Sequence, residues 1–190
     1  MFKKLLLLSL LTCLKLFAAP NTVYVELEGG IGLEDGFSTK TDDYAYDSGF
    51  VGSIAVGYQL DSYRLELEGR YSKDKLYSMG NYSASGDLIK NSQMLNAYYS
   101  FYNHSKLITT LGAGVGITSI ELNDLVEFNT PQKDLKNRNI LSYQALFSVG
   151  YMITDSVIIS LKYRYFYTAK SDDFNACDDN IFTLSLRYLF

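Results

Sequence analysis

The chain has 190 residues, room for one domain, and its composition, with 17 tyrosines and only two prolines, argues against both a disordered chain and a helical membrane protein. Abundant aromatic, β-branched and glycine residues favour strands. The formal net charge of −4 argues against a nucleic-acid partner.

Residues 1–19 have the order of a secretory signal peptide. Two lysines precede the apolar residues 5–11, and Ala18 and Ala19 supply the small residues of a cleavage site. Cleavage after either alanine fits, and residues 20–190 then form the mature domain. The apolar run is shorter than the roughly 20 residues of a spanning helix, which argues against an uncleaved helical anchor.

Removal of this segment changes the charge and the cysteine content. Lys3, Lys4 and Lys15 leave with it, so the basic count falls from 17 to 14 against 21 acids, and the mature chain carries a formal charge of −7. Cys13 leaves as well, and Cys177 then has no partner for an intramolecular disulfide.

The mature sequence alternates apolar and polar residues in segments of about ten, which is typical of strands in a membrane barrel. In the clearest segment, residues 63–71, apolar side chains alternate with two arginines and two glutamates, so the four charges share one face of a strand. The assignment of the fourth segment as a strand depends on Asn96, Tyr98 and Ser100 forming its inward face. We predict eight strands, at about 22–33, 49–60, 63–71, 93–102, 107–118, 140–151, 157–166 and 181–190.

The connections between these strands alternate between short and long. Short turns lie at 61–62, 103–105 and 152–156, and long connections at 34–48, 72–92, 119–139 and 167–180. In an up-and-down barrel this order places the termini and the short turns on one side and the long loops on the other, as in outer-membrane proteins. The sequence therefore predicts an all-β fold, an eight-stranded antiparallel up-and-down transmembrane β-barrel with short periplasmic turns and four long extracellular loops.

Aromatic residues on the apolar faces gather at both ends of the predicted strands. Two such groups suit the two membrane interfaces, because a tyrosine ring prefers a place that is apolar on one side and wet on the other. This favours a membrane barrel over a soluble periplasmic carrier, which would turn the same faces inward around a ligand. The predicted belt residues are Phe50, Tyr71, Tyr143, Tyr165 and Phe182 at the long-loop ends, and Tyr58, Tyr63, Phe101, Tyr151, Tyr188 and Phe190 at the short-turn ends.

The last predicted strand ends on Phe190, and Phe182, Leu184, Leu186 and Tyr188 share its face. This spacing resembles the C-terminal strand that outer-membrane barrel proteins present to their insertion machinery. The resemblance implies that Phe190 belongs to an insertion signal.

The mature chain is also similar to the opacity-type surface-antigen barrels, which are eight-stranded like the OmpA barrel. The similarity spans the third to eighth strands, whereas the first strand and the long loops carry no match. The residues that carry it are 94–99 (MLNAYY), 111–116 (LGAGVG), 143–145 (YQA) and 163–165 (YRY). The resemblance implies an eight-stranded barrel exposed at the cell surface, without implying a particular activity.

Charged residues on the polar faces would line the lumen of this barrel. Four acids then face five bases, and an eight-stranded barrel is just wide enough for side chains to fill its interior. Buried charges persist only when they are paired, so we predict a salt-bridged interior without a wide pore; ion conduction is the alternative. The predicted network comprises Glu26, Glu28, Arg64, Glu66, Glu68, Arg70, Lys162, Arg164 and Arg187.

The sequence predicts no catalytic, cofactor or metal site. His104, the only histidine, falls in a predicted periplasmic turn, away from the outer rim where a lipid- or peptide-cleaving triad would need it. Cys177 is interpreted as an inert thiol, with pairing between molecules as the alternative. Acids in the first and last long loops could hold calcium but lack EF-hand spacing, which favours a solvated acidic surface. These acids are Asp42, Asp43, Asp47, Asp172, Asp173, Asp178 and Asp179.

We therefore expect a non-enzymatic outer-membrane surface protein whose scaffold displays four long loops for adhesion, immune exposure or envelope integrity. Its expected partners are outer-membrane lipids, the barrel-insertion machinery and an extracellular host or cell-surface ligand, without nucleic acid or a cofactor. The alternatives are a small-solute pore, a lipid-modifying barrel enzyme and a soluble periplasmic carrier.

Overall fold

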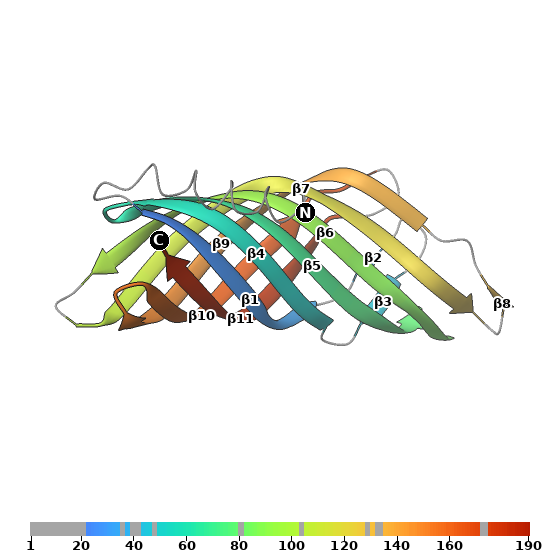
Figure 1. The fold of residues 1–190 in the computed structure, drawn as a ribbon. Coiled ribbons are helices and arrows are strands. Elements are labelled where there is room, and N and C mark those ends of the chain that lie inside the picture. The colour runs from blue at the N-terminus through green and yellow to red at the C-terminus, as the bar shows by residue number, and fades with distance from the viewer. Residues whose placement is uncertain are drawn as a thin grey trace, which may run out of the picture.

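The computed structural model describes residues 22–34, 37–38, 43–46, 49–79, 82–102, 105–127, 130–131, 135–171 and 175–190. Eight long antiparallel strands close into a barrel with tilted strands (Figure 1), and three short strands extend it at one end. Among the described residues no helix is long and apolar enough to cross a membrane. The long strands are β1 (Thr22–Glu34), β4 (Gly49–Leu60), β5 (Tyr63–Met79), β6 (Tyr82–Tyr102), β7 (Leu107–Glu127), β9 (Leu135–Thr154), β10 (Val157–Thr168) and β11 (Cys177–Leu189); the short ones are β2 (Phe37–Ser38), β3 (Asp43–Tyr46) and β8 (Thr130–Pro131).

The barrel closes where the first long strand meets the last. Each long strand pairs with the long strand that follows it in the chain, and β1 pairs with β11, Ile31 lying opposite Phe182. At the short-turn end the Phe190 backbone N–H donates to the Val23 carbonyl at 3.0 Å, and the Thr22 hydroxyl donates to the Phe190 carbonyl at 2.6 Å. Closure lets the strands satisfy backbone groups that lipid could not.

The structure confirms the eight predicted strands, but two of the predicted long loops are largely strand. β5 and β6 continue through most of residues 72–92 as one hairpin, and β7 and β9 do the same in 119–139. These extensions project from the barrel at the right-hand end of Figure 1. Beyond Tyr71 the outward positions of β5 hold Lys73 and Lys75, so the apolar–polar alternation that marks a half-buried strand ends while the backbone ladder continues.

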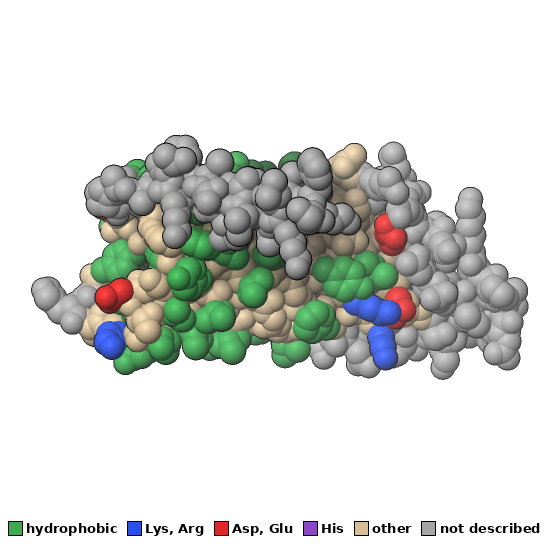
Figure 2. All heavy atoms as spheres, viewed as in Figure 1, with side chains coloured by type: hydrophobic (Ala, Val, Ile, Leu, Met, Phe, Trp, Pro, Cys, Tyr) green, Lys and Arg blue, Asp and Glu red, His purple; other side chains and the backbone are tan. Residues whose placement is uncertain are grey.

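The outer wall is apolar and the interior is polar. Outward side chains such as Leu67 and Leu161 are 67% and 62% exposed, whereas Glu26 and Arg64 are 0% and 1% exposed. Figure 2 shows hydrophobic side chains over the visible described wall, with charged side chains toward its two ends. This reverses the usual pattern of a water-soluble protein. The soluble carrier, which requires an apolar interior, is therefore the wrong alternative.

Leu67 lies midway between Tyr63 and Tyr71 on the outer face of β5. A substitution at this position tests whether lipid or water covers the outer wall. In lipid vesicles Leu67→Arg is expected to lower the free energy of unfolding by about 2–4 kcal/mol, the cost of an arginine at the bilayer midplane. The matched control, Leu107→Arg at the first residue of β7, is expected to cost about 0–1 kcal/mol because it lies near an interface. Guanidinium unfolding of vesicle-refolded protein measures both, and equal costs would show that lipid does not cover this wall.

Candidate functional site in the barrel interior

The structure places all nine predicted lumen residues inside the barrel, none of them more than 8% exposed. They come from β1, β5, β10 and β11, and β10, β11 and β1 are adjacent in the ring. Because side chains alternate between the two faces of a strand, the charged side chains of β10, β11 and β1 line one half of the interior wall. β5, which contributes the others, is separated from β1 by β4 alone. The opposite half, from β6, β7 and β9, supplies neutral polar side chains such as Asn96 and Gln144.

Glu26 and Glu28 on β1 form the centre of the first cluster. Lys162 Nζ lies 2.8 Å from Glu26 Oε1 and also hydrogen-bonds to Glu28. Arg187 Nε donates to Glu26 Oε2 at 2.9 Å, and Arg164 Nη2 donates to Glu28 Oε2 at 3.0 Å. Two adjacent carboxylates thus hold three cations that lie far away in the sequence.

Arg164 joins this cluster to a second one around Glu68. Its Nη1 donates to Glu68 Oε1 at 2.5 Å and to Gln144 Oε1 at 2.9 Å. Gln144 Oε1 also accepts a hydrogen bond from Arg70 Nη1 at 3.2 Å, and Gln144 Nε2 donates to Glu68 Oε2 at the same distance. Gln144, which the sequence analysis did not single out, therefore connects two arginines with a carboxylate.

Glu66 is held by neutral donors. The hydroxyls of Tyr24 and Tyr98 donate to it at 2.9 and 2.8 Å, and Asn96 Nδ2 donates at 3.0 Å. Arg64 lies against the same two rings, 4.5 Å from the Tyr98 centroid and 5.5 Å from that of Tyr24. The inward positions of Asn96 and Tyr98 are those that the prediction for their strand required.

Two glycines make room for these tyrosines. A Cβ at Gly57 would lie 2.2 Å from the Tyr24 ring, and a Cβ at Gly112 would lie 2.3 Å from the Tyr98 ring. Each glycine faces its tyrosine across a strand pair. Neither contact could be predicted from the sequence, because a glycine on a polar face gives no information about the side chain that fills the space above it.

A third group of charges lies at the long-loop end of the interior. Lys90 Nζ donates to both carboxylate oxygens of Asp179, at 2.8 and 2.9 Å, and Asp74 is buried beside them. Burial raises the pKa of Asp74 to about 6, and Lys90 partly opposes that shift. The predicted solvated acidic surface is therefore wrong for Asp179, which is 7% exposed and ion-paired.

These three residues complete the charge balance. The described interior contains six buried carboxylates and six buried cations, because Asp74, Asp179 and Lys90 join the nine predicted residues. The interior is therefore formally neutral while both signs of charge are fully buried, which is the condition under which buried ions are tolerated.

An apolar layer separates the mouth from the main network. Val51, Met94, Phe166 and Ile181 pack together with at most 2% exposure, and the Arg70 guanidinium lies 3.7 Å from the centre of the Phe166 ring. A cavity between this layer and the mouth charges measures only about 10 Å³, roughly the space of one water molecule. Side chains therefore leave little free space at this end of the described interior.

The remaining predicted residues lie on the wall or outside the described residues. All eleven predicted belt residues are on the outer wall and exposed. Cys177 is buried at the start of β11 and forms no disulfide with any described residue. His104, Asp42, Asp47, Asp172, Asp173 and the Asp43 side chain lie outside the described residues. Within the described residues no three histidine, cysteine or acidic side chains gather to hold a metal ion.

Arg164 is the most informative residue to change because it contacts two carboxylates. Arg164→Met retains much of the side-chain volume but leaves Glu28 and Glu68 short of a cation, and it is expected to lower the free energy of unfolding by about 3–5 kcal/mol. Adding Glu68→Gln should recover part of that loss. Urea unfolding in detergent measures the series, and an unchanged stability of Arg164→Met would mean that water solvates these charges.

Comparisons with known proteins agree with this architecture. Residues 5–190 match the family model described as the outer membrane protein beta-barrel domain. Outer membrane protein PagN of Salmonella typhimurium is 26% identical, over 74% of this chain and 73% of that protein. Neisserial surface protein A has the same fold, with a TM-score of 0.67, 20% identity, and coverage of 90% of this chain and all of that one. Ail of Yersinia pestis, the attachment invasion locus protein, gives a TM-score of 0.50 and 12% identity, with coverage of 90% and 97%.

The family match covers nearly the whole chain. The apolar outer wall is what a barrel surrounded by the lipid of an outer membrane requires. The protein is therefore a barrel of the bacterial outer membrane with an interior of buried charges. The chain belongs to the outer membrane protein β-barrel domain family.

Proposed function

We propose that this protein is a non-enzymatic surface protein whose closed barrel displays extracellular hairpins to a ligand on another cell. The observation that carries the proposal is the charge-filled interior: six carboxylates and six cations occupy the described lumen, and the cavity below its mouth holds about one water. A barrel filled in this way serves as a rigid scaffold, so its interactions with other molecules fall to the outer ends of its strands.

The two long hairpins support display. β5 continues for eight residues beyond Tyr71, to Met79, which corresponds to about 25 Å along the strand. β6 pairs with this extension as far as the Met79–Tyr82 pair. β7 and β9 form a second extension, in which they pair with each other as far as Leu122 and Leu135. Hairpins of this length reach well beyond the apolar band and present side chains in a fixed register.

The partners of the interior carboxylates support a non-enzymatic role. Glu26, Glu28, Glu66, Glu68 and Asp179 each contact a cation or a neutral donor within the described barrel. Ail, a barrel of the same fold, is named for attachment and invasion and has been solved with the heparin analogue sucrose octasulfate. Adhesion through the hairpins is our extension of that role to this chain.

Two further roles belong to this proposal. The exposed outer rings, Tyr63 and Tyr71 among them, would anchor the barrel at the two membrane interfaces. The outward residues of β11 and the exposed Phe190 that follows it would be recognised by the insertion machinery during assembly. Both roles use the outer wall and leave the hairpins free for a ligand.

Shortening the hairpins separately tests the proposal. Replacing residues 77–85 or residues 123–134 with Asn-Gly leaves the Leu76–Gly86 or Leu122–Leu135 pair next to a two-residue turn. Bacteria that express the intact protein should adhere to cultured epithelial cells at least tenfold more than vector controls, and at least one shortened variant should lose this gain. Equal surface amounts and an unchanged heat-dependent gel shift control for folding. Adherence at the vector level for the intact protein would refute the proposal.

A further inference from the structure

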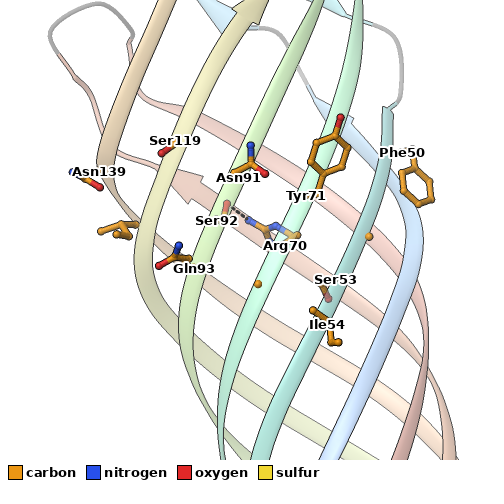
Figure 3. Close-up of a pocket in the computed structure, with 13 residues that line it drawn as sticks. Phe50, Ser53, Ile54, Arg70, Tyr71, Asn91, Ser92, Gln93, Ser119 and Asn139 are labelled. Atoms are coloured by element: carbon orange, nitrogen blue, oxygen red, sulfur yellow. Dashed lines mark hydrogen bonds between the residues drawn. The ribbon is translucent and has the colours of Figure 1, made fainter. Parts of the chain in front are cut away.

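A groove of about 540 Å³ crosses the outer wall near the outer aromatic residues (Figure 3). Its lining comes from β4, β5, β6, β7 and β9. Gly52 and Gly69 take outward positions in it, and a Cβ at Gly69 would meet no atom within 4 Å. Ile54 and Ile117 add apolar sides. The groove is open to the lipid side of the wall, and its volume lies within the roughly 300–1,000 Å³ of small-molecule sites.

The groove lies at a gap in the ring of outer aromatic residues. Phe50 on β4 and Tyr71 on β5 border it on one side, and Asn139 on β9 lines its other side. Between them the outward side chains of β6 at this level are Asn91, opposite Tyr71, and Gln93, opposite Gly69. Amides thus stand on β6 at the level where β4 and β5 carry Phe50 and Tyr71.

The polar rim continues onto the next two strands. Ser119 on β7 and Asn139 on β9 line the groove as well, at a β-bulge where the register shifts between Thr118 and Ile120. Asn139 has φ of 61°, a left-handed conformation that asparagine tolerates better than most residues, and a bulge re-aims the side chains beside it. Figure 3 shows Asn91, Gln93, Ser119 and Asn139 on three neighbouring strands.

These amides have no protein partner in the described barrel. The structure records no hydrogen bond between the Asn91, Gln93 or Asn139 side chain and any described residue, and all three are exposed. At a membrane interface, polar groups that water no longer fully solvates gain from an external partner. The groove therefore combines an apolar floor with a rim that requires hydrogen-bonding groups.

We propose that the groove binds a glycolipid of the outer leaflet, with an acyl chain over Gly52 and Gly69 and the sugar hydroxyls and acyl amides on the rim. Amide side chains both donate and accept hydrogen bonds, as sugar hydroxyls and acyl amides do. A phosphodiester only accepts hydrogen bonds, and proteins commonly bind it through lysine or arginine. The one charged lining residue, Arg70, instead turns inward, donating to Gln144 at 3.2 Å and to Ser92 at 3.3 Å. This site is independent of adhesion by the hairpins.

The test is native mass spectrometry of the detergent-solubilised full chain with monophosphoryl lipid A, against phosphatidylethanolamine as the competing lipid. The wild-type protein should bind one lipid A saturably and at least tenfold more tightly than phosphatidylethanolamine. Gly69→Phe fills the groove and should abolish this binding. Gly29→Phe is the matched control, because Gly29 also has no atom within 4 Å of its Cβ position but does not line the groove.

A second variant covers the case in which Gly69→Phe does not fold. Asn91→Ala combined with Gln93→Ala removes two rim amides and should weaken lipid A binding by on the order of tenfold, as expected for two hydrogen bonds. Equal binding of the two lipids, or unchanged binding by folded Gly69→Phe or by the double variant, would overturn the proposal. A wild-type dimer that Gly69→Phe alone dissociates would also overturn it, because the groove would then be a contact between copies.

Discussion

Charge balance within a narrow barrel is the constraint on which the rest of this structure depends. An eight-stranded ring leaves an interior that side chains fill, and an ion there is tolerated only with partners. Glu26 shows how partners are shared, since it contacts Lys162 and Arg187. It also lies 3.7 Å from Arg64, whose guanidinium makes no hydrogen bond to any described residue and lies against two tyrosine rings. Shared carboxylates make the network cooperative, because the loss of one cation leaves more than one partner short of charge.

The same strands that build this interior build the membrane surface. On β5 every second residue from Arg64 to Arg70 points inward with a charge, and the residues between them form an apolar stripe that ends at Tyr71. Our two proposals therefore use places outside both the charged interior and the continuous apolar stripe. These are the hairpins beyond the apolar band and the groove where Gly69 interrupts the outer wall.

Alternation in the sequence predicted the strands and the direction of each side chain, because both depend only on residues two apart. Cross-barrel contacts could not be predicted in this way. Lys90 and Asp179 are 89 residues apart and both lay in predicted loops. Polar neighbours, Asn91 beside Lys90 and Asp178 and Asn180 beside Asp179, hide the strand pattern there. The role of Tyr24 depends on Gly57 of the neighbouring strand, and alternation within a single strand gives no information about the residue on the next one.

Current recording from the purified, refolded protein in planar bilayers tests the closed, charge-filled interior most directly. We expect no regular conductance steps across physiological voltages, because ion pairs and the apolar layer around Phe166 occupy the described lumen. Stable steps of uniform size that scale with voltage and salt concentration would contradict it, and would show that water and ions pass between these charges.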